Sequence, residues 1–245
     1  DAGPLTEVEY WRRRMQRLTN ITEQLKTKDC KNVILILTSL TKGGEGSSSN
    51  SDSSMFALLR RWKQIDVKIT EHANEAKDNE KYLKTLEKFI EPLYQSQPLQ
   101  IIDTLPALMN SIKMIHTIAR YYNTTERMTT LFAKITNQMI INCTKYITKS
   151  GRPAELWERN PEELVKHFEA CLKLNEAYQE QYRLTKDRLL TMPKGKQFDF
   201  NETQIFGKFD LFCRRCIKLI DMFSTIFQFT ALASHNLEGM EHLIK

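Results

Sequence analysis

The sequence predicts an all-α protein, an elongated bundle of long antiparallel helices without a sheet. The stretch from Phe56 to Glu91 contains neither proline nor glycine, and its apolar residues recur every seven positions. That is the spacing of a helix that packs lengthwise against other helices. At about 1.5 Å of rise per residue this helix would span roughly 54 Å. A compact core needs less, so a bundle of long helices is favoured over a globule.

A seam of mostly apolar residues follows this helix in two rows. The first row is Trp62, Ile69, Ala76, Leu83 and Ile90, and the second is Ile65, His72, Asn79 and Leu86. We expect the seam to be buried, with His72 as a hydrogen-bonded core histidine rather than a ligand. His72 and Asn79 make its middle polar, and such residues specify register or a partner contact in coiled coils.

Two helices are predicted before the long one. The first covers residues 6–28 and opens with Thr6 and Glu9 at the spacing of a capping box. Residues 32–40 are apolar enough for a buried strand, but helix on both sides favours a second helix. Residues 43–54 (GGEGSSSNSDSS) contain no apolar side chain, so we expect a flexible low-complexity loop. A phosphorylatable regulatory loop is the alternative interpretation of that segment.

Proline divides the middle of the chain into further helices. Pro92 ends the long helix, and the apolar pattern begins again at Pro98. Pro106 is expected to kink or split this second segment, because proline removes a helical hydrogen bond. Asn123 starts another helix, which we expect to reach about Thr148.

The clearest start of a helix is residues 160–163, Asn-Pro-Glu-Glu. They provide an N-cap, a proline in the first turn and a glutamate three residues after the cap. The helix should run to about Thr191, and residues 192–200 should form a loop.

The last long helix, residues 203–233, is apolar on nearly every face. A helix of this kind is central to a bundle or covered by something else. Residues 236–245 have the pattern of a further helix. The chain begins with Asp1 rather than Met, so we expect it to be a piece of a longer polypeptide.

Charge and hydropathy argue against nucleic-acid and membrane partners. The net charge of +6 is spread over helical patterns that also carry acids, whereas a nucleic-acid site needs a contiguous basic face. The apolar stretches at residues 33–37 and 217–229 are too short or too interrupted to cross a bilayer, which takes about 20 apolar residues. The five cysteines are scattered, and we expect reduced, buried thiols.

The motifs offer no catalytic residue, cofactor site or metal site. Cys213 and Cys216 have the spacing of half a zinc site, but the sequence has no second pair, so core packing is the better interpretation. Gly43-Gly44-Glu45-Gly46 lacks the Gly-Lys-Ser/Thr ending of a phosphate-binding loop, and the five histidines lie on different segments.

Three blocks of sequence resemble the N-terminal tail region of dynein heavy chains. They are residues 3–13 (GPLTEVEYWRR), 74–83 (NEAKDNEKYL) and 198–215 (FDFNETQIFGKFDLFCRR). Residues 101–128 are most similar to axonemal heavy chains of the outer-arm type. The 43–54 loop departs from the family, because the corresponding loop in dynein heavy chains is expected to be much shorter.

The resemblance implies a scaffold role for the whole segment 1–245. In this family the tail is a string of helical bundles that joins heavy chains to one another and carries WD-repeat intermediate chains and light chains. It also fixes the complex to the doublet microtubule in the axoneme of a cilium or flagellum. ATP and magnesium would belong to the motor domains of the parent polypeptide, a minus-end-directed microtubule motor. The resemblance transfers no catalytic residue, cofactor or metal ligand to this segment.

We therefore expect a non-catalytic assembly segment. The candidate packing or assembly residues are Trp11, Trp62, Ile69, His72, Asn79, Leu83, Phe206, Phe209 and Phe212. The alternative is a cytosolic helical adaptor or a membrane-surface module, which salt-sensitive binding to anionic lipid would favour. A small helical enzyme is a third hypothesis, for which the sequence offers no cluster of titratable residues.

Overall fold

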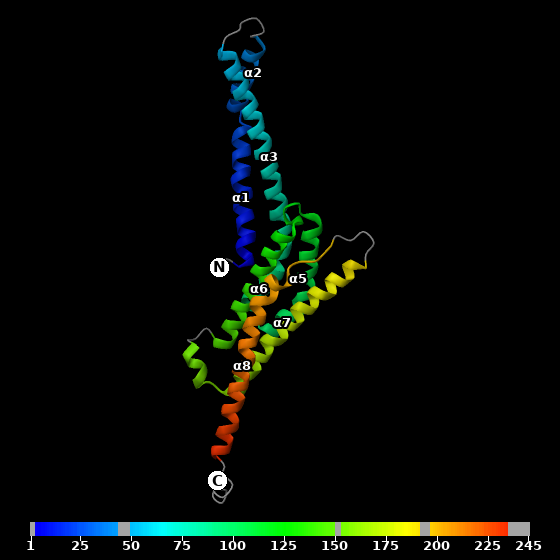
Figure 1. Cartoon of the computed structure of the whole chain (residues 1–245). Helices are drawn as coiled ribbons and strands as arrows, with labels where there is room; N and C mark the ends of the chain where they lie inside the picture. Colours follow the sequence, from blue (N-terminus) through cyan, green and yellow to red (C-terminus); the bar gives the residue numbers. More distant parts are fainter. Residues whose placement is uncertain (1–2, 44–49, 150–152, 192–196, 235–245) are drawn as a thin grey trace, which may run out of the picture. The chain divides into compact units, whose positions relative to one another are not determined.

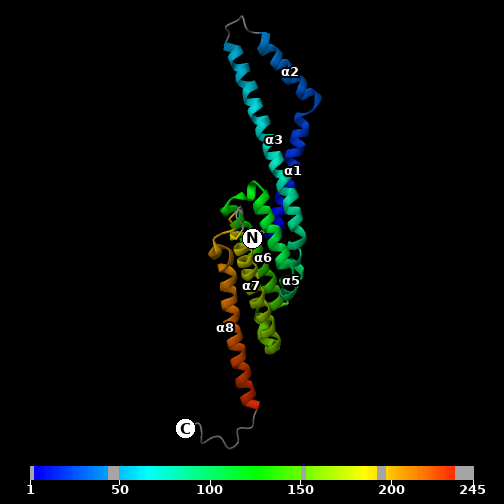
Figure 2. The same ribbon diagram turned by 90° about the vertical axis from the view of Figure 1, so that its right-hand side faces the viewer.

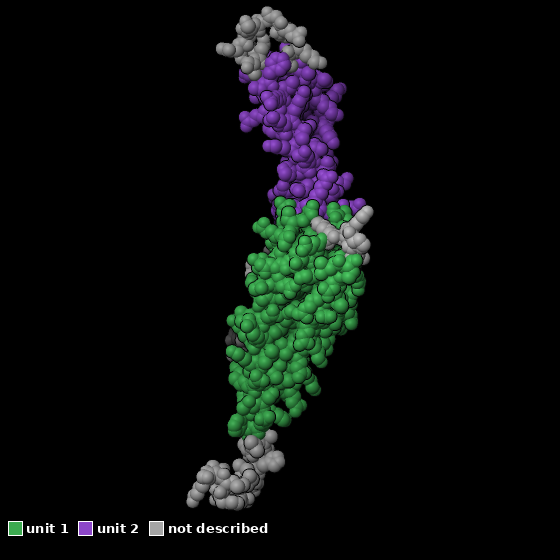
Figure 3. Space-filling model, turned by 45° about the vertical axis from the view of Figure 1, so that its right-hand side comes forward, with its two compact units in different colours: residues 1–4, 86–118, 122–245 green, residues 5–85, 119–121 purple. Residues whose placement is uncertain are grey.

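The computed structural model describes residues 3–43, 50–149, 153–191 and 197–234. Every regular element within these ranges is a helix, and none of these residues forms a strand, so the all-α prediction is confirmed. The chain divides into two compact units, coloured in Figure 3. Unit 1 comprises residues 1–4, 86–118 and 122–245, and unit 2 comprises residues 5–85 and 119–121.

Unit 2 is built from the first three helices. They are α1 (Pro4–Leu25), α2 (Lys28–Gly43) and α3 (Asn50–Ile90), of which unit 2 includes α3 as far as Thr85. In Figures 1 and 2, α1 and α2 follow one another and α3 returns in the opposite direction; Figure 2 shows that α2 is inclined to α3. The helical interpretation of residues 32–40 is confirmed, because α2 extends well beyond that apolar run at both ends.

The loop predicted at residues 43–54 ends earlier than the sequence indicated, because α3 begins at Asn50. The backbone is already helical from Asn50, and residues 44–49 lie outside the described ranges. Extending an existing helix by one residue costs far less than nucleating it, so a helix formed over an apolar stretch can continue into polar residues. Composition alone therefore misplaced this boundary.

Only part of the predicted seam on α3 is buried. Ala76, Asn79, Leu83, Leu86 and Ile90 are buried, whereas Trp62 and Ile69 are half-buried. Ile65 is 43% exposed, and His72 is exposed rather than in the core, with Glu75 as an ion-pair partner when protonated. The seven-residue repeat predicted which side of the helix is apolar, but burial also requires a neighbour opposite each turn.

Unit 1 holds the remaining helices. They are α4 (Pro92–Gln95), α5 (Pro98–Ile118), α6 (Thr125–Thr148), α7 (Pro161–Leu190) and α8 (Glu202–Ser234), with the 3₁₀ turns η1 (Tyr121–Asn123) and η2 (Pro153–Glu158). Tyr121 of η1 belongs to unit 2. Consecutive long helices of unit 1 run antiparallel, as the sequence predicted (Figure 1). The most extensive helix contact joins α5 and α7, which are parallel because each is antiparallel to α6.

Hydrogen bonds join α6 to the elements that pack against it. The Asn142 amide donates to the Ser96 carbonyl at 3.0 Å, which places the C-terminal part of α6 beside the start of α5. The Thr136 hydroxyl lies 3.4 Å from the Tyr178 hydroxyl in the buried layer between α6 and α7. Most buried polar groups in proteins are hydrogen-bonded, so these contacts restrict how the helices can slide past one another.

A cluster of aromatic rings forms the core where α5, α6 and α7 meet the segment before α8. Phe132, Tyr182, Phe198 and Phe200 pack with ring centroids 4.9–6.0 Å apart, a spacing typical of favourable aromatic pairs. The Phe200 amide donates to the Tyr182 hydroxyl at 3.0 Å. Residues 197–200 are therefore held in place although they form no regular element.

The structure can be compared with three predictions from the sequence: the starts of α7 and α6 and the effect of Pro106. Asn160 caps α7 as predicted, because its side-chain oxygen accepts from the Glu162 amide at 2.9 Å. The cap of α6 is Thr124, one residue later than predicted. Pro106 does not split α5, which is continuous through it. Buried neighbours such as Leu105 and Leu108 stabilise that helix enough to offset a proline penalty of about 3 kcal/mol.

The buried part of the seam should be sensitive to truncation. Leu83 is fully buried, so Leu83→Ala should lower the free energy of unfolding by about 2–5 kcal/mol. Ile65→Ala on the same helix is the matched control, and it should change the free energy by less than about 0.5 kcal/mol because Ile65 is exposed. Urea denaturation followed by circular dichroism measures both. Equal losses for the two variants would contradict the division of the seam.

The N-cap of α7 should contribute measurably to stability. Asn160→Ala should lower the free energy of unfolding by about 1 kcal/mol, because the Glu162 amide loses its acceptor. Asn160→Asp keeps a side-chain oxygen at the same place and should retain most of the stability. Thermal or urea unfolding of the three proteins tests this. A loss with Asp as large as with Ala would argue against the capping contact.

Candidate functional site

Helix α2 leaves most of its apolar residues exposed. Ile34, Leu37 and Thr38 share one side of the helix and are half-buried. The others point away from that side: Leu35 is 65% exposed, and Val33, Ile36 and Leu40 are also exposed. Five consecutive apolar residues on a helix project in all directions, so one neighbouring helix cannot cover them all. The result is a large apolar surface of the kind that marks interaction sites.

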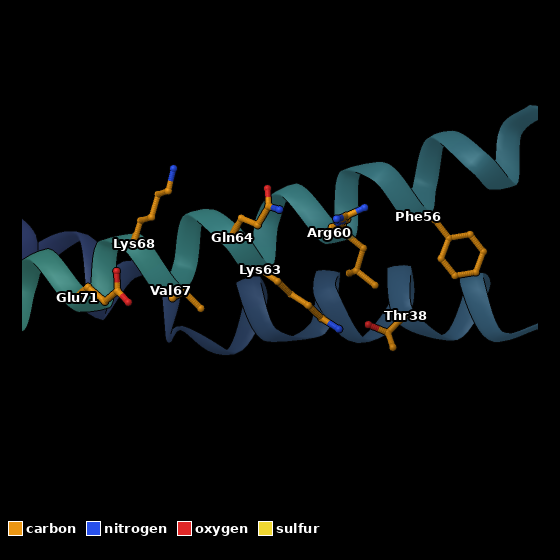
Figure 4. A pocket seen from close by; sticks show the side chains of 9 residues that line it. Thr38, Phe56, Arg60, Lys63, Gln64, Val67, Lys68 and Glu71 are labelled. Atoms are coloured by element: carbon orange, nitrogen blue, oxygen red, sulfur yellow. The ribbon is translucent and has the colours of Figure 1, made fainter.

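A groove of about 920 Å³ lies between α2 and α3 within unit 2. We call it the α2/α3 groove. Its lining residues are Thr38, Phe56, Leu59, Arg60, Lys63, Gln64, Val67, Lys68 and Glu71. Figure 4 shows Phe56 and Lys63 reaching from α3 toward α2. Phe56 and Val67 are exposed and Leu59 is buried, so the groove has an apolar base that solvent can reach.

The charged residues of the α2/α3 groove are mostly cations. Arg60, Lys63 and Lys68 are exposed, and among the lining residues that the structure describes Glu71 is the one carboxylate. Within the described part of the chain none of the three cations makes an ion pair. By contrast, Glu9 on α1 pairs with Arg12 and Arg13, and the hydrogen bond from Arg13 lowers the pKa of the Glu9 carboxyl.

Several of the candidate residues predicted from the sequence lie in the core. Trp11 is buried, with the ring of Tyr121 at a centroid distance of 4.6 Å. Leu83 is buried in unit 2, and Phe206 and Phe209 are buried in unit 1. Phe206 packs edge-on against Tyr178 and Tyr182 at 5.2 and 5.3 Å. These positions contribute to packing within their units.

The other candidates are less enclosed. Trp62, Ile69 and Phe212 are half-buried, and His72 is exposed. Asn79 is fully buried, but its amide nitrogen has no hydrogen-bond partner in the described residues. An unsatisfied buried amide costs about 1–3 kcal/mol. The nine candidates are therefore divided between the two units and differ in their burial within each unit.

Helix α8 has a second exposed apolar region, in unit 1. Its first half is packed through Ile205, Phe209 and Cys213, but Ile226, Phe227 and Phe229 are exposed, the last to 67%. The sequence predicted that so apolar a helix would be central or covered. In the C-terminal half, Phe223 is buried against Trp157 and Phe168, but residues 224–230 are exposed to solvent.

Four of the five cysteines converge in the core of unit 1. Cys143 on α6, Cys171 on α7, and Cys213 and Cys216 on α8 are all buried and free. Hydrogen bonding to the Cys171 side chain and burial hold the pKa of the Cys143 thiol well above its usual range. Burial raises the pKa of Cys213 and of Cys216 to about 12. At neutral pH the Cys143, Cys213 and Cys216 thiols are therefore protonated, whereas the thiolate is the reactive form.

Metal and membrane criteria are not met by the described residues. Among them, no group of three or more histidine, cysteine or acidic side chains has an arrangement that could hold a metal ion. None of the described helices is both long and apolar enough to cross a membrane.

The buried cysteines should be protected from alkylation in the folded protein. With iodoacetamide under native conditions, Cys30 should react at least about tenfold faster than the other four, because it is only half-buried. In denaturant all five should react at similar rates, which is the internal control. Peptide mass spectrometry gives each rate. Rapid native labelling of Cys213 or Cys216 would contradict the buried cluster.

Sequence reasoning did not identify the α2/α3 groove. The available signal was the run of apolar residues at 33–37, because five in succession exceed what one helical face can bury. The basic residues Arg60 and Lys63 are spaced three apart, so they lie on one side of a helix. Which side of α3 faces α2 depends on the packing of two separate segments, and that information is not local.

Comparison with known proteins gives a consistent family. Residues 1–245 match the family described as "Dynein heavy chain, N-terminal region 1". The dynein gamma chain of the flagellar outer arm of Chlamydomonas reinhardtii is 45% identical over 100% of this chain. Dynein axonemal heavy chain 5 of Mus musculus is 41% identical over 99% of this chain, and mouse axonemal heavy chain 8 is 38% identical over 99%. The chain spans about 5% of the length of each of these relatives.

Proposed function

The chain belongs to the N-terminal region of the dynein heavy-chain family, and from that premise we propose that it is a non-catalytic scaffold segment of an axonemal dynein tail. Its role is to associate with other heavy chains and to carry intermediate and light chains. In this proposal the parent polypeptide binds ATP and magnesium in separate motor domains and drives ciliary beating along the doublet microtubule.

The apolar surface of α2 is the observation that best supports a scaffold role. Val33, Leu35, Ile36 and Leu40 are all more than half exposed. Each fully buried side chain of this kind contributes about 1.5–3 kcal/mol, so covering α2 with a partner would supply much of the free energy that a stable interface needs. A motor complex built from several chains requires such permanent contacts.

A charge placed on α2 should weaken assembly. In the full-length heavy chain, Leu35→Glu should reduce the recovery of other heavy chains and of intermediate chains by at least about tenfold, because the interface would bury an unpaired carboxylate. Folding should be unaffected, since Leu35 is exposed in the isolated chain. Co-purification from ciliary extract, with quantitative mass spectrometry of the subunits, measures the recovery.

Asn32→Glu is the matched control on the same helix. Asn32 is exposed and polar, so the same change of charge should leave subunit recovery within about twofold. Normal recovery of every subunit with Leu35→Glu would overturn the scaffold role of α2. Salt-sensitive binding of the heavy chain to anionic vesicles, lost in Leu35→Glu, would favour the membrane-surface alternative instead.

A further inference from the structure

We propose that the α2/α3 groove binds an acidic amphipathic helix of a partner chain. The proposal rests on the scaffold role, because it names the chemistry of one partner that the tail would hold. Three properties of the groove support it: its helical walls, its apolar base and its unpaired cations.

The helical walls determine which kind of backbone can dock. The groove runs along α3 from Phe56 to Glu71, which corresponds to roughly 23 Å at about 1.5 Å per residue. Backbone groups within the two helices are already hydrogen-bonded to one another, so neither wall offers an edge with which an extended strand could pair. A helix of about 15 residues satisfies its own backbone and matches this length.

The apolar base determines one face of the partner. Phe56 and Val67 are exposed to 54% and 55%, and they lie on the same side of α3 as Leu59. A partner helix with apolar residues at i, i+3, i+4 and i+7 would cover all three side chains at once. A small molecule fits less well, because its site normally buries 70–90% of the ligand surface and the two helices leave the groove open (Figure 4).

The cations determine the charge of the partner. Among the described lining residues, Arg60, Lys63 and Lys68 stand against one carboxylate, that of Glu71, and none of the three cations makes an ion pair there. Elsewhere in the described chain similar cations are paired, as Lys186 is with Asp199 and Glu202. Carboxylates beside the apolar face of a partner helix would complement the three groove cations.

A second copy of this chain is a poorer occupant. The chain carries a net charge of +6, so two copies repel one another at the distances where encounter begins. An acidic helix from a different subunit would instead be attracted to the groove, and its association rate would fall as the salt concentration rises.

Site-specific crosslinking in the intact dynein complex tests the proposal. The photo-crosslinking amino acid p-benzoylphenylalanine at Val67 reports on the groove. The same amino acid at Ile65 is the matched control, because Ile65 is exposed but does not line the groove. The Val67 probe should crosslink to a peptide with helical apolar spacing and an excess of Asp and Glu. The Ile65 probe should not reach that peptide.

Charge reversal then tests the role of the cations. In the same complex, Arg60→Glu with Lys63→Glu should reduce the Val67 crosslink at least about tenfold, because two attractive contacts become repulsive. Lys81→Glu with Lys84→Glu changes the net charge equally on the same helix outside the groove, and should leave the yield within about twofold. Raising the salt concentration should lower the yield in the unmodified protein.

Four outcomes would overturn the proposal: a crosslinked segment that is basic or neutral, one from a second copy of this chain, no crosslink specific to Val67, or a yield that charge reversal does not change. Cosedimentation with phosphatidylserine vesicles that is lost on charge reversal, without a peptide crosslink, would assign the groove to a membrane surface. The scaffold role is judged separately. If Leu35→Glu disrupts assembly and the Val67 crosslink is absent, the groove proposal fails and the scaffold role of α2 stands. If the Val67 probe crosslinks to an acidic helix and Leu35→Glu assembles normally, the scaffold role of α2 fails and the groove still binds a partner helix.

Discussion

Burial of apolar helix faces is the interaction on which this chain depends. In the described residues there is no strand ladder, all five cysteines are free, and no group of side chains is arranged to hold a metal. Helices of this kind gain most of their stability from tertiary packing rather than from intrinsic propensity. Each helix therefore needs a neighbour along its apolar side, and where that neighbour is missing the apolar residues remain exposed.

Unit 1 meets this requirement well over most of its length. The Phe132, Tyr182, Phe198 and Phe200 rings fill the space between three helices and the segment before α8, and polar residues at the helix ends find partners. Unit 2 meets it less completely, because α2 and the facing part of α3 expose many of their apolar side chains. That contrast between a well-packed bundle and a helical pair with uncovered surface agrees with the proposed scaffold role.

The cysteines and the Asn79 amide show how a polar or reactive group takes its character from its surroundings. Cys213 and Cys216 have the spacing of a metal or redox motif, but they lie with Cys143 and Cys171 in the buried core, where the pKa values of the Cys143, Cys213 and Cys216 thiols are raised. Asn79 lies on the buried part of α3, and no described residue partners its amide nitrogen. His72 lies one heptad earlier in the same row and is exposed. Two residues in the same row of one helix, only two turns apart, can therefore differ completely in their exposure to solvent.

The sequence by itself determined the all-helical class, the order of the helices and most of their ends, because these depend on local signals. The apolar periodicity, the Asn160 cap and each family block are patterns among residues that lie close together in the sequence. Only the tertiary structure decided that Pro106 lies inside a continuous helix, that the α3 seam is buried only from Ala76 onward, and that four cysteines meet. It also decided that Arg60 and Lys63 line a groove with α2. The physical reason is that burial depends on which distant segment lies opposite a residue, and a pattern along one helix does not contain that information.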